Sequence, residues 1–222
     1  MGNSQTTETI NNNEQKNLNH LFCRAVDQGD LQKAGQLLKE GANIDASGAL
    51  MYTQDLKITD WLIKNGADVN AQYGGWTPLH WAAARNDLPK AEFLIKNGAK
   101  VNARGDANTT PVHEAAARGS VEALEFLIQN GADVTVKNSL DWTVLHEIAA
   151  NYLRGDTSND KKIIEIAIKA GVDINAQDIY GNTALNYASY PGTEEMMDLL
   201  LEQGAGANSS LTFFGDVFNQ FC

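Results

Sequence analysis

The segment Thr110–Ala132, TPVHEAAARGSVEALEFLIQNGA, is the stretch of this sequence that decides the fold. It predicts a short helix, a tight turn at Gly119, a second helix and a stop at Gly131. Related text begins at three other threonines: TPLHWAAARN at Thr77, TVLHEIAAN at Thr143 and TALNYASYPG at Thr183. The return of the same text about every thirty-three residues is the signature of an architecture built from stacked repeats.

The glycines that close the helix pairs show where the repeat is regular. They are spaced by 25, 32, 33, 40 and 33 residues, at Gly41, Gly66, Gly98, Gly131, Gly171 and Gly204. The second unit is therefore about eight residues short, which leaves little room for a full hairpin and first helix. The fifth contains about seven extra residues within the polar stretch NYLRGDTSND, which we interpret as a loop insertion. We expect units at about 16–47, 48–70, 71–103, 104–136, 137–176 and 177–209.

The repeated motif resembles that of the ankyrin repeat family, whose units run T-P-L-H-x-A and close on G-A-D-V-N, the text of Gly66–Asn70. The resemblance covers nearly all of the chain after about residue 16. It implies an all-α fold with short β-hairpin loops, in which about six helix-turn-helix units stack into a solenoid. It also implies a non-enzymatic module that binds other proteins.

Two further sets of positions follow from this pattern. A threonine hydroxyl can accept from free backbone N–H groups at the start of each first helix, as expected for Thr77, Thr110, Thr143 and Thr183. The residue two before each threonine needs a left-handed backbone in the hairpin turn. These positions hold residue types that tolerate that conformation: Gly75, Asn108, Asp141 and Gly181.

His80, His113 and His146 each follow one of these threonines by three residues. The resemblance implies that each imidazole bridges its threonine and a neighbouring backbone, whereas a general base would need surroundings of its own. His20 and Cys23, three residues apart, are the remaining candidates for a nucleophile pair, but nothing supplies an orienting group or oxyanion donors. We interpret Cys23 as a small buried apolar residue. Without a phosphate loop or a metal-binding motif, we expect no enzyme activity, no metal and no cofactor.

The composition narrows the class of partner. A net charge of −11 at pH 7 argues against nucleic acid, whose phosphates need a basic surface, and favours a protein partner. No apolar run approaches the length of a membrane-spanning helix, and the polar N-terminus carries no secretory signal. Two cysteines at opposite ends, Cys23 and Cys222, fit a reducing compartment. We therefore expect a monomeric cytoplasmic protein.

The two ends of the chain differ from the repeats. Residues 1–15 have one aliphatic side chain and no Lys or Arg, so we expect a disordered polar tail. The opening MGNSQT fits the pattern for N-myristoylation of Gly2, although a polar start also matches this loose pattern by chance. Residues 210–222 are either a cap on the last unit or a partner-binding segment. Four of their side chains fall on one face of an amphipathic helix: Phe214, Val217, Phe218 and Phe221.

The resemblance places partner contacts in the hairpin residues before each threonine and at the end of each first helix. Those positions are Tyr73, Trp76, Ala84, Arg85, Asp106, Thr109, Arg118, Leu140, Trp142, Asn151, Ile179, Tyr180, Asn182 and Tyr190. The aromatic residues among them are of the types enriched in interface hot spots. Acidic residues edge this set, at Asp106, Glu114, Asp141 and Glu147. Together they indicate a partner with apolar anchors and basic character.

Replacing both Trp76 and Trp142 by Ala is expected to abolish partner binding with little effect on the melting temperature. Two other functions stay open at this point. A secreted effector of an intracellular bacterium would use the same array to bind a host protein in the host cytosol. A thiol enzyme built on Cys23 and His20 is the third, and thiol-reactivity profiling would distinguish it.

Overall fold

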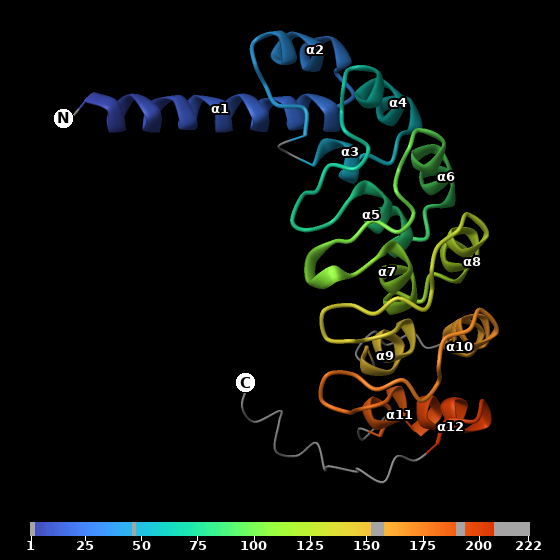
Figure 1. The fold of residues 1–222 in the computed structure, drawn as a ribbon. Coiled ribbons are helices and arrows are strands. Elements are labelled where there is room, and N and C mark those ends of the chain that lie inside the picture. The colour runs from blue at the N-terminus through green and yellow to red at the C-terminus, as the bar shows by residue number, and fades with distance from the viewer. Residues whose placement is uncertain (1–2, 46–47, 152–157, 190–193, 207–222) are drawn as a thin grey trace.

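The computed structural model describes residues 3–45, 48–151, 158–189 and 194–206, with the backbone alone for residues 3–11. Within these ranges the chain forms helix pairs joined by loops, and no extended strand (Figure 1). The helices are α1 Asn3–Asp27, α2 Leu31–Lys39, α3 Ala49–Tyr52, α4 Leu56–Lys64, α5 Pro78–Ala84, α6 Leu88–Lys96, α7 Pro111–Ala117, α8 Val121–Gln129, α9 Val144–Ala150, α10 Asp160–Lys169, α11 Ala184–Tyr187 and α12 Glu194–Glu202, with the 3-10 turn η1 Asp106–Asn108. Three predicted features lie outside the described residues: lipidation of Gly2, the contact residue Tyr190 and the segment 210–222.

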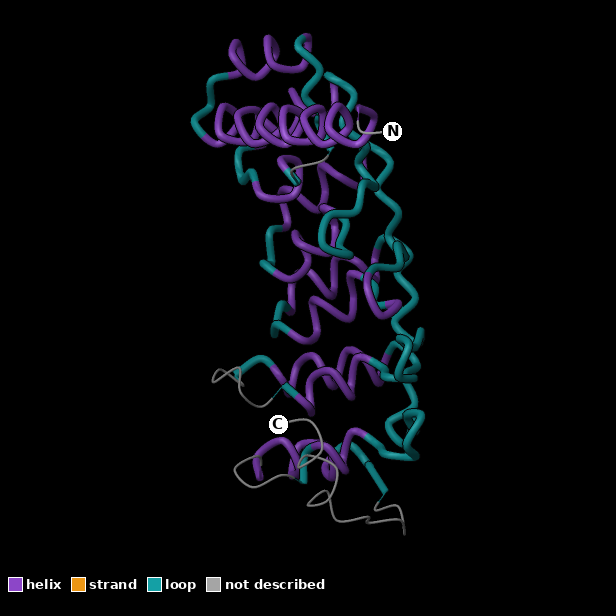
Figure 2. The backbone as a smooth tube through the Cα atoms, turned by 90° about the vertical axis from the view of Figure 1, so that its left-hand side faces the viewer, coloured by secondary structure: helices purple, strands orange, loops and turns teal. Residues whose placement is uncertain are grey.

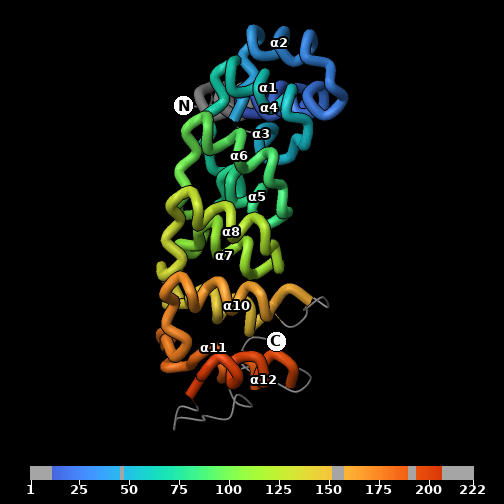
Figure 3. The backbone as a smooth tube through the Cα atoms, turned by 90° about the vertical axis from the view of Figure 1, so that its right-hand side faces the viewer, coloured from blue at the N-terminus to red at the C-terminus, as the bar shows by residue number. Residues whose placement is uncertain are grey.

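The helices stack in two columns. An inner column contains the short first helices α3, α5, α7, α9 and α11, and an outer column contains α2, α4, α6, α8, α10 and α12 (Figures 1 and 3). The long loops between successive units gather along one edge of the stack (Figure 2). Each unit therefore contacts the unit before it and the unit after it, as the repeat predicts.

The threonines begin the inner helices in the predicted way. In α5, the Thr77 side chain and the N3 residue His80 satisfy each other's backbone N–H groups, which is a capping box. The same arrangement begins α7, α9 and α11, at Thr110, Thr143 and Thr183. Proline occupies the first turn of α5 and α7, where its missing donor is harmless.

The hairpin turns also have the predicted backbone. The four positions expected to be left-handed have φ angles of 81°, 57°, 58° and 79°, at Gly75, Asn108, Asp141 and Gly181. Gly75 is needed for a second reason, because a Cβ there would lie 2.5 Å from the Cβ of Asp106 in the next hairpin. The prediction of left-handed residues is confirmed.

The loops are turns linked to one another rather than β-hairpins with strands. One isolated bridge, between Tyr73 and Trp76, is the extent of strand-like pairing in the described chain. Neighbouring loops are joined by single backbone hydrogen bonds instead. The N–H groups of Asp106, Ser139 and Ile179 donate to Gly75, Ala107 and Leu140 at 2.7, 2.8 and 3.1 Å, respectively.

The second unit is short, as predicted, and its first helix has a single turn. The helix α3 contains four residues, of which Ala49, Leu50 and Met51 are buried, and the backbone turns extended at Thr53. Its last carbonyl groups therefore lack helical partners.

The N-terminal segment differs from the expected disorder of residues 1–15, because α1 begins at Asn3. Its middle is fixed to the first unit: the Gln15 side chain donates to the carbonyl of Gly41 at 2.8 Å. Once residues 15–27 are helical, each further residue toward the N-terminus adds a hydrogen bond without a new nucleation step. The first half of α1 extends away from the stack beyond the loops (Figure 1).

The core divides into two hydrophobic clusters. One lies in the first two units, around Phe22, Leu37 and Leu62, and the other runs through the remaining units from Leu79 to Ala205. The boundary between them falls between the short second unit and the third.

Lys90 bridges this boundary. Its position in α6 is occupied by Ala123, Ile163 and Met196 in later units, all buried, yet Lys90 itself is only 2% exposed. Its ammonium donates to the carbonyl of Met51 at 2.9 Å and to that of Thr53, which are the groups that the early end of α3 leaves free. Burial lowers the pKa of Lys90 to about 8. The charge is retained because it satisfies these two carbonyls.

We predict that Lys90→Met lowers the free energy of unfolding by about 1–3 kcal/mol, since it leaves two buried carbonyls without a donor while keeping the volume filled. Urea denaturation measures the loss, and hydrogen exchange should accelerate first near Ala49–Tyr52. Lys96→Met on the same helix is the control, because Lys96 pairs only with the exposed Glu92 and its removal should change stability by less than about 0.5 kcal/mol. Equal stability of the Lys90 variant and the wild type would contradict the bridge.

Candidate protein-binding face

The inner helices present one variable side chain per unit beside the loops. It directly follows the histidine or, in the last unit, the equivalent Asn186, and is Trp81, Glu114, Glu147 or Tyr187. We group with it the loop residue just before each threonine, which is Trp76, Thr109, Trp142 or Asn182. We call these eight positions the inner face. Because the inner helices stack, the face runs along the whole regular part of the array (Figure 1).

The histidines behind this face hold the units together. The Thr110 N–H donates to Nδ1 of His113 at 3.3 Å, so Nε2 carries the proton and donates to the carbonyl of Trp142 at 3.2 Å. His80 and His146 make the same contacts, to Thr109 and Asn182. Burial lowers the pKa of all three, that of His113 to about 4. These are neutral structural residues, which confirms the prediction.

Cys23 and His20, the candidate nucleophile pair, lie in different surroundings. Cys23 packs against the N-terminal cluster, while His20 is exposed to solvent. In the part of the chain that the structure describes, no group of three or more His, Cys, Asp or Glu side chains is arranged to hold a metal ion. The same part contains no helix whose length and apolar character would suit a membrane span.

Aromatic rings cover the inner face where the third unit meets the short second unit. Trp76 lies 5.6 Å from Trp81, between ring centroids, and Tyr52 packs edge-on against Trp81 at 5.3 Å and against Tyr73 at 6.0 Å. The sequence pattern identified Tyr73 and Trp76 but missed the other two. Trp81 could have been found because the residue type at its position changes from unit to unit. Tyr52 could not, because the short second unit does not align with the other units.

A second aromatic cluster lies at the other end of the face. Trp142 packs against Tyr187 at 4.9 Å and stacks on His146 at 6.3 Å. Its indole N–H donates to Asp178 at 3.2 Å, and the Tyr187 hydroxyl donates to the same carboxylate at 2.5 Å. Burial and this contact with Asp178 both raise the pKa of Tyr187. Trp142 therefore stabilises the join between the last two units.

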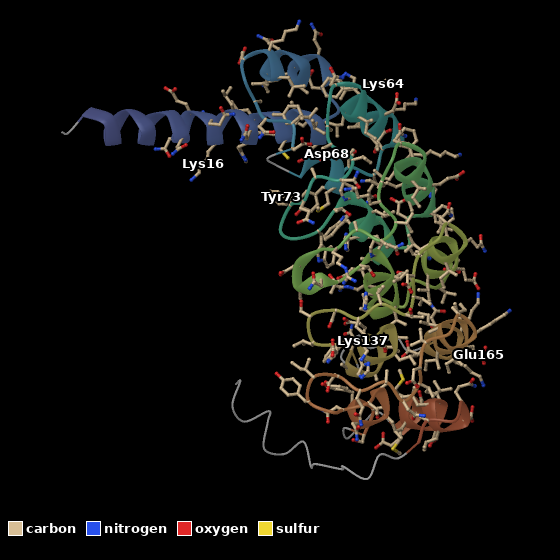
Figure 4. All side chains as sticks on the ribbon, in the orientation of Figure 1. Lys16, Lys64, Asp68, Tyr73, Lys137 and Glu165 are labelled. Carbon is tan, nitrogen blue, oxygen red and sulfur yellow. The ribbon has the colours of Figure 1, made fainter. Side chains whose placement is uncertain are left out.

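The loop tips carry the most exposed apolar side chains of the predicted set. Tyr180 is 68% exposed and Ile179 52%, followed by Tyr73 at 42% and Leu140 at 36%. Figure 4 shows Tyr73 on the loop side of the stack, opposite Glu165 of the outer column. Of the four, Tyr73 packs on Tyr52, whereas Ile179 and Tyr180 are more than half exposed.

The polar members of the predicted set differ from one another. Arg85, Asp106 and Arg118 are exposed. Asn151, in contrast, is half-buried and its amide donates to the carbonyl of Ala117 at 2.5 Å, so it joins the fifth unit to the fourth. Asn151 therefore has a structural role between two units, and its prediction as a partner contact stays a prediction.

Glu114 and Glu147 lie at the centre of the inner face, on α7 and α9. Glu114 is 9% exposed, and burial raises its pKa, with Arg118 and the Thr109 hydroxyl acting in the opposite direction. Burial and the neighbouring charge of Glu114 raise the pKa of Glu147 to about 7, and the Asn138 amide opposes this. The two carboxylates are thus close enough for their charges to interact, in a poorly solvated place.

The fold and this face define a protein of stacked helix-loop-helix repeats. The model of ankyrin repeats in three copies matches residues 20–105, 49–138 and 112–210, and the chain belongs to the ankyrin repeat family. A segment of 46 residues is 44% identical to an ankyrin repeat protein of Fowlpox virus (strain NVSL). That match covers 21% of this chain and 7% of the viral protein, so the two share repeat units and differ greatly in overall extent.

The expectation that tryptophan removal leaves stability unchanged is not supported by these contacts. We predict that Trp142→Ala lowers the free energy of unfolding by about 2–3 kcal/mol, since it removes a packed ring and one of the donors to Asp178. Tyr180→Ala, at an exposed tip, should stay within about 0.5 kcal/mol of the wild type. Urea denaturation of both variants measures this difference, and equal stabilities would contradict it.

The buried histidines also predict how stability depends on pH. A histidine whose pKa is lower in the folded state adds stability that is complete above about pH 6.5 and is lost as the pH falls toward 4. For His113 the loss amounts to about 3 kcal/mol. His113→Asn, which copies Asn186 of the last unit, should be less stable than the wild type at pH 7.5, and this deficit should shrink at pH 5. Urea denaturation at both values tests this, and a constant deficit would contradict it.

Proposed function

We propose that this protein is a binding module for a protein partner, which it contacts with the loop tips and the inner face. Ankyrin repeats are generally protein–protein interaction modules, and the chain belongs to that family. The observation that carries the proposal for this chain is a set of exposed apolar side chains at the loop tips of the third, fifth and sixth units. They are Tyr73, Leu140, Ile179 and Tyr180.

These side chains are not explained by the fold. The repeat is held together by the capping boxes, the histidine bridges and the core clusters, none of which uses a tip side chain. Water-exposed Tyr, Leu and Ile of this kind are typical of surfaces that a partner covers. We take the partner to contact several units at once, since the tips are spread along one edge of the stack (Figure 2).

The partner is proposed to combine apolar anchors with basic groups. The chain has a net charge of −11, which disfavours nucleic acid and attracts a basic surface. The acidic side chains Asp106 and Asp141 are exposed beside the tips. Catalysis is not part of the proposed function, because the recurring histidines are neutral, buried and occupied by structural hydrogen bonds.

The test is affinity capture from a cell lysate with a tip variant, Ile179→Ser combined with Tyr180→Ala. We expect the partner captured by the wild type to be lost by about tenfold or more, because truncated hot-spot side chains weaken binding by at least this factor. Leu201→Ser is the matched control, since Leu201 is 45% exposed but lies on the outer helix α12. Undiminished capture by the tip variant, or equal loss with the control, would contradict the proposal.

A further inference from the structure

Asp178 is buried and Glu147 is half-buried, and the two carboxylates differ in how many hydrogen bonds they accept. Asp178 accepts four hydrogen bonds: from the backbone of Tyr180 and Asn182, the Trp142 indole and the Tyr187 hydroxyl. Glu147 accepts one among the described residues, from Asn138 at 3.0 Å. A carboxylate has about four acceptor sites, so Glu147 has capacity for further donors.

The charge of Arg118 acts on Glu114, but neither carboxylate forms an ion pair with a placed side chain of the described residues. Neither Glu114 nor Glu147 has a Lys, Arg or His nitrogen within 4 Å among the placed side chains. Burying a carboxylate without a counter-charge is unfavourable, and two adjacent ones are more so. A buried, unpaired carboxylate of this kind is expected at a functional site, where another molecule supplies the counter-charge.

The surroundings favour a basic side chain in that role. Trp142 lies in the loop before α9, in the same unit as Glu147, and Tyr187 lies on α11 of the next unit. Trp76 and Trp81 belong to the unit before that of Glu114, so aromatic rings border the carboxylates on both sides along the face. Aromatic faces accept the apolar stem and the charge of Lys or Arg. Residues 207–222 contain neither Lys nor Arg, so this segment cannot supply the cation.

We propose that Glu147, reinforced by the charge of Glu114, receives a Lys or Arg side chain from the bound partner protein. This inference rests on the proposed function and adds the chemistry of one contact. The cation donates to the free acceptor sites of Glu147, and its stem lies along the inner face toward Trp142. The loop tips hold the apolar parts of the same partner segment.

Binding of the cation then depends on pH. The ion pair with the partner's cation forms only when Glu147 is ionised, and the pKa of Glu147 is about 7 in the free protein. The titratable groups on the helices packed against α9 include Glu114 of α7, Asp160 of α10 and Tyr187 of α11. Of these, Glu114 is the one whose charge contributes to the pKa of Glu147. Affinity is expected to rise about tenfold between pH 6 and pH 8, as the ionised fraction of Glu147 rises.

The experiment uses a display library of short random peptides selected on the immobilised full-length protein. We expect the retained peptides to share a Lys or Arg. For a retained peptide with Arg, replacing that residue by citrulline, its neutral isostere, should weaken binding about tenfold, as should Glu147→Gln in the protein. The two changes together should weaken binding no more than either alone, since both remove the same contact. Glu147→Gln should also abolish the pH dependence.

Stability provides a second measurement that separates this role from a structural one. A carboxyl whose pKa is raised by folding adds stability at low pH that is lost as the pH rises through the folded value. Glu147→Gln should therefore be more stable than the wild type at pH 8, even though it binds less well. Asp178→Asn, at the satisfied carboxylate, should be less stable. Glu147→Gln with reduced stability at pH 8 would show a structural residue and overturn the inference.

The outcomes also distinguish this inference from the proposed function. Peptides that need Ile179 and Tyr180 but lack a basic residue, or that bind Glu147→Gln equally well, would overturn the inference and leave the proposed function intact. Failure to retain any peptide would overturn it as well, while lysate capture still decides whether the protein is a binding module.

Discussion

The structure depends on one hydrogen-bonded bridge that recurs between units. Each histidine accepts from the threonine that begins its own helix and donates to a backbone carbonyl of the next unit, as in the contact of His113 with Trp142. The bridge sets the helix start and the spacing of the stack at once. In the last unit Asn186 retains the contact with Thr183 within the unit. At the short second unit Lys90 joins the neighbouring units in a different way, through the free carbonyls of α3.

Much of this fold could be predicted from the sequence because its determinants are local. Thr110 and His113 are three residues apart, and Asn108 precedes the same helix. Gly131 ends the next helix, so one continuous stretch of sequence determines the structure of a unit. Repetition then determines how the units are arranged in space, since equal units can bury their apolar sides only against each other. The irregular second unit was predictable for the same reason, because a spacing of 25 residues cannot contain a full unit.

The features that sequence did not reveal depend on contacts between units. Nothing in the text around Lys90 shows that its ammonium reaches Met51, 39 residues earlier. The resemblance placed Trp142 among the partner contacts, as the loop residue before Thr143, yet its ring packs on Tyr187 of the following unit. Asn151 was assigned in the same way and donates to Ala117. A position whose residue type varies between units is not fixed by the repeat pattern. Only the structure shows whether its side chain contacts a neighbouring unit.

This distinction bears on how a repeat protein acquires a binding surface. The position after each histidine is adjacent to the most constrained residue of the unit, yet it holds Trp81, Glu114, Glu147 and Tyr187 in turn. Where the array itself uses that position, as at Tyr187, the polar atom is paired with Asp178 at 2.5 Å. At Glu147 a single amide is paired and the acidic neighbour opposes ionisation. A stable fold would be expected to replace such a charge by a neutral residue. Under the proposed function, a cation from the partner explains the presence of this charge at the centre of the inner face.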